Sequence, residues 1–476
     1  MRRSRLQCLA CAFGAAALLA AAPAPARTLP VSITFESLPA FDEPHTPAQY
    51  DRVGLLKTVA ENKTPDAVLI ILPGFTAGAG LVRSLAAAIV ERADGRVAVW
   101  AVDRRTFALE DHRGMRLGGG DPSRAFAYYF SSGSGFTERK EADFAFMRYW
   151  GVATTVQDVR AVVHAARARY PHARILLGGH SMGATIAQAF AAWDFEGTPG
   201  FREIDGLVLI DGGGHDDDWV RDTGLKQYHE GIAAIEKGEY YWNDPARGAS
   251  PEFLRLGEIG AFAALGSTSR DAPSFLAPLL PQMFTLPPGV VITNAAAFGL
   301  ATDHETTKIS YFAANCGTLD HTPRAVIRAS GVALLGWKDA GAVGEPTSLF
   351  TFAAALTELR ETNGLEWYGA RALNAEIDLL ANLDSRSPLT AALCAQHGLT
   401  ATHTAEVNLP VFGFACGQSE DTTDRLEWYR GRIASSDVTL LTAADYAHLD
   451  PLFAGDRAGG NRLLAALVPW LKKRVN

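Results

Sequence analysis

Apolar residues along the chain follow two patterns that alternate through its first half. Continuous apolar runs are typical of strands buried on both faces of a parallel sheet. They occupy 67–72, 97–102, 174–177 and 206–211. Between them, the stretches 81–92 and 152–170 repeat apolar residues at helical spacing. With an opening strand at 31–35, this alternation predicts a mostly parallel, doubly wound α/β sheet.

The alternation stops after Asp211-Gly212-Gly213-Gly214 and resumes with an apolar run at 409–416. The intervening stretch of about 190 residues is too long for a connection and has the size of a domain. Its segments look mainly helical or irregular. We therefore predict a core in two parts, 27–211 and 406–476, with an insertion at 212–405. A strand at 438–441 and helices at 422–433 and 460–473 complete the core.

Two apolar segments of the insertion have two interpretations. Residues 275–280 and 350–352 either form the insertion's own core or provide a wall for an acyl group. The aromatic-rich stretch 114–150 also has two interpretations. It either lines a ligand-binding site at the loop edge of the sheet or packs on the surface without a role in binding.

A catalytic motif stands at the junction of one strand with the next helix. Gly179-His180-Ser181-Met182-Gly183 follows the apolar run at 174–177 and leads into a helix. This strand–turn–helix context is the one that a nucleophile elbow requires. The turn strains the backbone at Ser181, so glycines are needed where a side chain would collide. Ser181 is therefore the candidate nucleophile, and the N–H of Met182 points to where an oxyanion would form.

Together, these residues resemble the α/β-hydrolase fold family, in particular its serine esterases and lipases. The resemblance covers 31–211 and 406–476 and implies that the insertion at 212–405 is a cap. It also implies a second oxyanion donor in the loop after the strand at 67–72, namely the backbone N–H of Phe75. A nucleotide fingerprint is not expected there, because Arg83 stands where the third glycine would be.

The order nucleophile, acid, histidine in this family implies that His448 is the general base. His448 lies between the last strand and the terminal helix. The acid is expected after the strand at 409–416. Spacing favours Glu420, and the general preference for aspartate favours Asp421, which is also a plausible N-cap. We favour Asp421, with Glu420 as the alternative and Asp211 as a third option.

The N-terminus has the three regions of a secretory signal peptide, with cleavage expected after Ala26. This segment, 1–26, predicts a periplasmic or secreted protein with no membrane span after its removal. Losing its three arginines makes the formal net charge of −8 more negative still. An acidic chain without a basic block predicts no nucleic-acid partner.

The cysteines left after signal removal are Cys316, Cys394 and Cys416. An odd number in an exported protein predicts one disulfide, for which we expect the pair Cys316–Cys394. The acidic run after His215, residues 216–218, is expected to start a helix rather than bind a metal. No metal or cofactor is expected.

The sequence therefore predicts an exported serine hydrolase that cleaves a small-molecule ester or acyl substrate. A peptidase or amidase on the same fold is the alternative within enzymes. A non-catalytic binding protein is the alternative outside them.

Overall fold

The computed structural model describes residues 29–118, 121–277, 284, 286, 289–327, 332–357, 364–455 and 460–475. The predicted signal peptide at 1–26 lies outside these residues. Across the described ranges, no helix combines the length and the apolar character that crossing a membrane demands.

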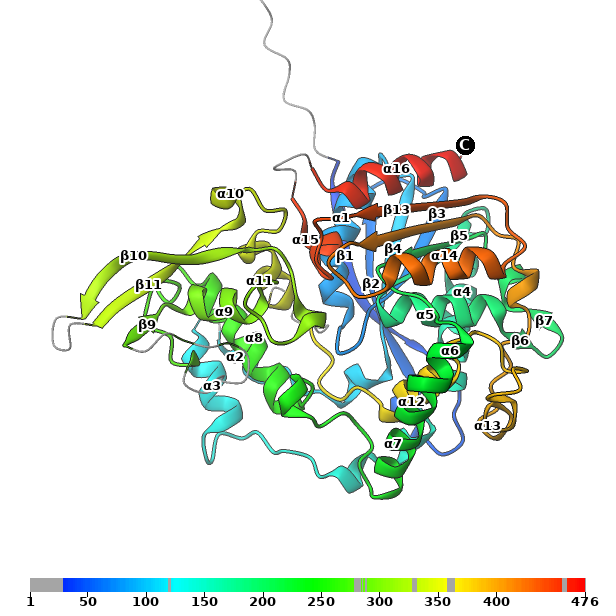
Figure 1. The fold of residues 1–476 in the computed structure, drawn as a ribbon, viewed down its shortest axis with the longest axis horizontal. Helices are drawn as coiled ribbons and strands as arrows, with labels where there is room; N and C mark the ends of the chain where they lie inside the picture. The colour runs from blue at the N-terminus through cyan, green and yellow to red at the C-terminus, as the bar shows by residue number, and fades with distance from the viewer. Residues whose placement is uncertain are drawn as a thin grey trace, which may run out of the picture.

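One eight-stranded sheet forms the centre of the core (Figure 1). Its order is β1-β2-β4-β3-β5-β8-β12-β13, and every neighbouring pair from β4 to β13 is parallel. β1 and β2 add an antiparallel edge. The strands are β1 Val31–Pro39, β2 Arg52–Ala60, β3 Ala67–Leu72, β4 Val97–Asp103, β5 Arg174–His180, β8 Gly206–Ile210, β12 Val411–Cys416 and β13 Val438–Ala443. The predicted doubly wound α/β fold is confirmed.

Helices cover both faces of this sheet (Figure 1). On one face α1 and α16 lie together, and on the other α4 and α5 pack side by side with α14 next to them. Their bounds are α1 Arg83–Arg92, α4 Val152–Arg169, α5 Met182–Ala192, α14 Thr422–Arg432 and α16 Arg462–Arg474. Because the sheet is covered twice, every residue of β3 and β8 is buried.

Strand β2, which lies between β1 and β4, is not anticipated by the sequence pattern, because residues 38–60 are Pro-rich and uninformative. β2 pairs with β1 from Val31 opposite Ala60 to Pro39 opposite Arg52. A hairpin of this kind depends on cross-strand pairing, so its register is decided by the partner strand rather than by its own alternation.

Between β8 and β12, no strand of the described residues joins the main sheet. This stretch is mainly helical, as predicted, but it also contains a three-stranded sheet in the order β10-β11-β9 that the sequence analysis did not foresee. Its elements are α6 Asp217–Trp219, α7 Leu225–Glu236, α8 Pro251–Leu265, β9 Val290–Ile292, α9 Asn294–Thr302, β10 Gly317–Ile327, β11 Val332–Asp339, α10 Ala340–Val343, α11 Leu349–Thr357, α12 Arg371–Leu379 and α13 Ala391–Gln396.

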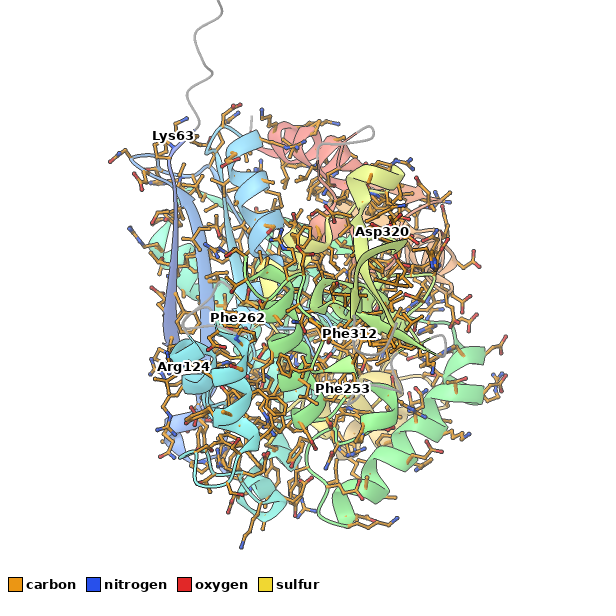
Figure 2. All side chains as sticks on the ribbon, turned by 90° about the vertical axis from the view of Figure 1, so that its left-hand side faces the viewer. Lys63, Arg124, Phe253, Phe262, Phe312 and Asp320 are labelled. Atoms are coloured by element: carbon orange, nitrogen blue, oxygen red, sulfur yellow. The ribbon has the colours of Figure 1, made fainter. Side chains whose placement is uncertain are left out.

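Apolar side chains of the insertion pack on one another. Phe253 and Phe312 lie among its crowded side chains (Figure 2), and both line a small apolar cavity between α8, α9 and α11. Phe352 is fully buried and stacks on Phe453 with ring centroids 4.7 Å apart. Phe275 is exposed and touches Phe126 of α3 (Pro122–Phe130) instead. Among the described residues of 275–280 and 350–352, none lines the cavity that contains Ser181.

The predicted disulfide is not present in this structure. Cys316, Cys394 and Cys416 are each buried as free thiols. Each is enclosed in a different part of the fold, since Cys316 precedes β10, Cys394 lies in α13 and Cys416 ends β12. Counting cysteines gave no information about which of them the fold brings together.

Candidate active site

The turn between β5 and α5 holds Ser181 in a strained conformation. Its φ is 56° and its ψ is −127°, a backbone region that residues with side chains rarely adopt. A Cβ on Gly179 would lie 2.1 Å from the carbonyl carbon of Gly183, and one on Gly183 would lie 2.1 Å from the carbonyl oxygen of Leu72. The two glycines are therefore required by backbone contacts, as the motif predicted.

His448 meets a carboxylate that lies far from it in sequence. Its Nδ1 lies 2.7 Å from Oδ2 of Asp211, directly after β8. The side chain of Asp211 is fully buried, and it also accepts a hydrogen bond from the Cys416 N–H at 2.7 Å and one from the Ser419 hydroxyl at 2.6 Å. With Nδ1 engaged by the carboxylate, Nε2 is the ring nitrogen left to serve a hydroxyl.

This contact corrects the preference for Asp421. Asp421 is exposed, and its side chain makes no capping hydrogen bond at the start of α14. Glu420 lines the cavity but is also exposed, and neither carboxylate is bonded to His448. β8 and β12 are neighbouring parallel strands, so the loops after both reach the same edge of the sheet. The carboxylate bonded to His448 therefore follows β8, whereas the sequence favoured a carboxylate after β12.

The environment of Asp211 keeps it ionised. Burial raises the pKa of this carboxyl, but the hydrogen bonds from His448, Ser419 and Cys416 outweigh burial and hold the pKa below its ordinary value. An ionised carboxylate at this position fixes the tautomer of His448 and stabilises its protonated form.

His180, between the glycine and the serine of the elbow, supports the same loop. Its Nε2 lies 2.9 Å from the backbone carbonyl oxygen of His448, to which it donates, and the two rings are 4.5 Å apart. Burial, followed by the nearby His448, lowers the pKa of His180 to about 3. His180 is therefore neutral at neutral pH, and it fixes the backbone of His448 without adding a charge.

Phe75 lies in the loop after β3, and Arg104 binds three backbone carbonyl groups of this loop. The guanidinium donates to the carbonyl oxygens of Pro73, Gly74 and Ala77 at 3.0, 2.8 and 3.1 Å. Glu366 of the insertion binds the same guanidinium with both oxygens, at 3.0 and 2.5 Å. No described residue accepts the N–H of Phe75. The carbonyls of the loop thus point to Arg104, and the Phe75 N–H stays available.

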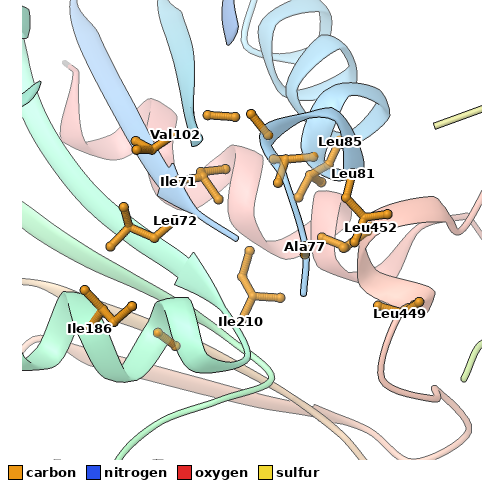
Figure 3. Packing of buried hydrophobic residues seen from close by; sticks show 14 of the residues in the cluster. Ile71, Leu72, Ala77, Leu81, Leu85, Val102, Ile186, Ile210, Leu449 and Leu452 are labelled. Atoms are coloured by element: carbon orange, nitrogen blue, oxygen red, sulfur yellow. The ribbon is translucent and has the colours of Figure 1, made fainter. Parts of the chain in front are cut away.

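The loop of Phe75 and the loop of His448 share one hydrophobic core. Leu449 and Leu452 follow His448 and are buried in the same cluster as Ala77 and Leu81, with Leu452 close to Ala77 (Figure 3). The core therefore fixes the candidate base relative to the candidate oxyanion donor.

Ser181, Met182, Phe75 and His448 open into one cavity of about 470 Å³. No hydrogen bond joins the Ser181 hydroxyl to a described residue. Hydrogen bonds between a nucleophile and its base often form only in the complex with substrate. Both polar and apolar side chains line the cavity. They also include residues of the insertion such as Tyr311, Asn374 and Asp378.

Two other stretches do not line the cavity of Ser181. None of the described residues of 114–150 lines this cavity, and Tyr129 packs against Trp367 instead. Asp216 caps α6 by accepting the N–H of Trp219 at 2.8 Å, as expected of a helix start. No group of metal-ligating side chains occurs among the residues that the structure describes.

The sequence analysis overlooked Ser419, His180, Arg104 and Glu366 as parts of the site. One signal was available for the acid: Asp211 ends a buried strand and precedes a run of glycines. A Cβ on Gly212 would lie 2.1 Å from the carbonyl oxygen of Ser181, so the chain at Asp211 passes directly beside the elbow. The contacts of Arg104 and Glu366 span 262 residues and left no local pattern.

Residues 67–229 match the family model described as alpha/beta hydrolase fold. No curated protein matches the chain. Solved structures with a similar chain path include an epoxide hydrolase from Vigna radiata, with 13% identity, a TM-score of 0.40 and coverage of 93% of this chain and 98% of that one. A thermostable carboxyl esterase from Bacillus coagulans has 13% identity, a TM-score of 0.39 and coverage of 94% and 100%. A soluble variant of monoglyceride lipase from Saccharomyces cerevisiae has 13% identity, a TM-score of 0.38 and coverage of 96% and 98%.

Proposed function

We propose that this chain, which has the α/β-hydrolase fold, is a serine hydrolase that cleaves a carboxylic ester through Ser181, His448 and Asp211. The observation that carries the proposal is the 2.7 Å hydrogen bond from His448 to the buried Asp211, beside the strained Ser181 in one cavity. Each residue has the chemistry of its role in a catalytic triad.

In the proposed reaction, Oγ of Ser181 attacks the carbonyl carbon of the ester while Nε2 of His448 takes its proton. The N–H groups of Met182 and Phe75 stabilise the tetrahedral oxyanion, and each such donor contributes about 3 kcal/mol to catalysis. His448 then protonates the departing alcohol, which leaves an acyl-serine. Water attacks the acyl-serine with His448 as base, and the carboxylic acid and free Ser181 are restored.

The residue at the elbow supports this chemistry over two others. Haloalkane dehalogenases and epoxide hydrolases that use this fold attack with a carboxylate, whereas this chain has a serine at that position. An amide or peptide substrate is the second candidate, because the same triad and oxyanion donors serve both leaving groups. A non-catalytic binding protein would not need a complete set of nucleophile, base, acid and oxyanion donors.

Export is the remaining part of the proposal. It rests on the basic start, apolar run and small-residue cleavage site of residues 1–26.

A fluorophosphonate probe tests the proposal directly, since it reacts only with an activated serine. We expect labelling of the wild type and loss of labelling in Ser181→Ala. Hydrolysis of p-nitrophenyl esters by this variant should fall by roughly three or more orders of magnitude. Ser131→Ala, at an exposed serine after α3, is the matched control and should retain both signals.

Comparing p-nitrophenyl esters with p-nitroanilides of the same acyl groups separates esterase from amidase. A folded wild type that neither reacts with the probe nor cleaves either class of substrate contradicts the proposal.

A further inference from the structure

The cavity of Ser181 continues into a second cavity beneath the insertion. This neighbour has a volume of about 490 Å³ and shares Phe75, Tyr311, Asn374 and Asp378 with the first. Asn374 and Asp378 are one turn apart on α12, so the same face of this helix borders both cavities. A substrate whose ester lies at Ser181 therefore has room to extend past Asp378.

Every arginine that lines the two cavities is already bound to an acceptor of the protein. Arg425 donates from Nε to the carbonyl oxygen of Gly213 at 3.0 Å. Arg371 donates to the carbonyl oxygen of Tyr241 at 3.2 Å and pairs with Glu239. Arg247 pairs with Asp244 at 3.4 Å. The positive charges of the cleft are thus partly neutralised or held by the backbone.

Three carboxylates of the same cleft have no such partner. The side-chain carboxylates of Asp378, Glu230 and Glu420 accept no hydrogen bond and form no ion pair with any residue that the structure describes. Glu230 lies on α7 and Glu420 follows β12, so the three approach the cleft from different elements. Asp378 occupies the shared wall between them.

The environment of Asp378 disfavours its negative charge. Burial raises the pKa of this carboxyl to about 7, and Arg425 offsets burial only in part. A carboxylate that is removed from water without a donor is costly, and a cation bound beside it would relieve that cost.

We propose that this cleft binds the cationic group of the substrate, with Asp378 as the main recognition residue and Glu230 and Glu420 as supporting charges. The substrate class is then an ester whose acyl or alcohol part bears an ammonium group. This inference rests on the proposed serine-hydrolase function.

Isosteric substrate pairs test the inference, because they differ only in charge. For a cation in the alcohol part, choline butyrate is compared with 3,3-dimethylbutyl butyrate. For a cation in the acyl part, the p-nitrophenyl esters of 4-(trimethylammonio)butanoate and 5,5-dimethylhexanoate are compared. Assays at pH 8 keep Asp378 ionised. We expect kcat/KM to favour the cationic member of at least one pair by about tenfold or more.

Variants then attribute the preference to the cleft. Asp378→Asn should bring the cationic-to-neutral ratio of kcat/KM close to 1, and Glu230→Gln, at an exposed position of α7, should lower it about twofold to threefold. Asp222→Asn, an exposed carboxylate of the insertion outside both cavities, is the matched control and should keep the wild-type ratio. Thermal melting shows whether each variant is folded.

The outcomes separate this inference from the function on which it rests. Cleavage of both members of each pair at equal rates overturns cation recognition and leaves the hydrolase intact. A preference that survives Asp378→Asn moves recognition away from this cleft. Cleavage of neither member, together with no labelling of Ser181, contradicts the hydrolase itself. If Asp378→Asn does not fold, cation recognition is still tested by the cationic-to-neutral ratio of kcat/KM in the wild type and in Glu230→Gln.

Discussion

At the scale of single residues, the site depends on one buried carboxylate with three donors. Asp211 accepts from His448, Ser419 and the backbone of Cys416, and these bonds overcome the unfavourable effect of burial on its charge. A neutral group of the same shape would keep the packing but lose the charge. It would also permit the wrong tautomer of the imidazole.

The residue-scale prediction distinguishes Asp211 from the acid that the sequence favoured. Asp211→Asn should lower the turnover rate by up to about four orders of magnitude, because an amide permits the wrong imidazole tautomer. Asp421→Asn is the matched control, and it should leave the turnover rate near that of the wild type. Steady-state kinetics on one p-nitrophenyl ester measures both. The opposite result would return the role of the acid to Asp421.

At the scale of elements, the insertion helps to build the site that it covers. Glu366 donates its backbone N–H to the carbonyl oxygen of Thr76, and its side chain binds Arg104 below the loop of Phe75. The Gly78 N–H donates to the carbonyl oxygen of Gly364. The position of one candidate oxyanion donor therefore depends on a segment nearly 300 residues further along the chain.

Arg104→Lys tests this dependence. A lysine keeps the charge but has a single ammonium group, which cannot hold three carbonyl oxygens and a carboxylate together. We expect the turnover rate to fall by about tenfold to a hundredfold with little change in KM, because displacing the Phe75 N–H weakens binding of the transition state more than binding of the substrate.

Arg124→Lys, at an exposed arginine of α3, is the matched control for this variant (Figure 2). A general loss of stability would instead lower the melting temperature and the fraction of active protein. An unchanged turnover rate in folded Arg104→Lys argues against a positioning role.

At the scale of the whole molecule, carboxyls with a raised pKa make the stability of the fold depend on pH. Burial raises the pKa of Glu258, Glu345 and Asp378 to about 7, and that of Asp303 and Asp450 to about 6. These groups have a pKa of about 4 in an unfolded chain, so between about pH 4 and 7 the folded protein holds protons that the unfolded protein releases. Their contribution to stability therefore falls as the pH rises.

Three buried histidines act in the other direction. Burial lowers the pKa of His180 and His215 to about 3 and also lowers that of His112, so below about pH 6.5 the unfolded chain takes up protons that the folded protein does not. Because the five carboxyls outnumber them, we expect a higher melting temperature at pH 5 than at pH 8. Calorimetry at constant ionic strength measures the melting temperature at each pH. Glu258→Gln should reduce the difference in melting temperature between pH 5 and pH 8. A melting temperature that rises steadily from pH 5 to 8 contradicts this expectation.

The sequence by itself determined the elements whose signal is local. Continuous apolar runs identify β3, β4, β5 and β8, because a strand buried on both faces needs them. The turn at Ser181 leaves no room for a side chain at Gly179 or Gly183. This pair of glycines is visible in the sequence, so the candidate nucleophile was identified without a structure. The order of triad residues in the resembling family, together with its place after the last strand of the core, made His448 the candidate base.

Only the tertiary structure decided which distant groups meet. Asp211 and Asp421 both follow buried strands, but the fold directs Asp211 toward His448 and leaves Asp421 in solvent. The three cysteines stay apart although their number suggested a pair. Such choices depend on side-chain direction and strand order, which arise from packing across hundreds of residues and leave no periodic trace in the sequence.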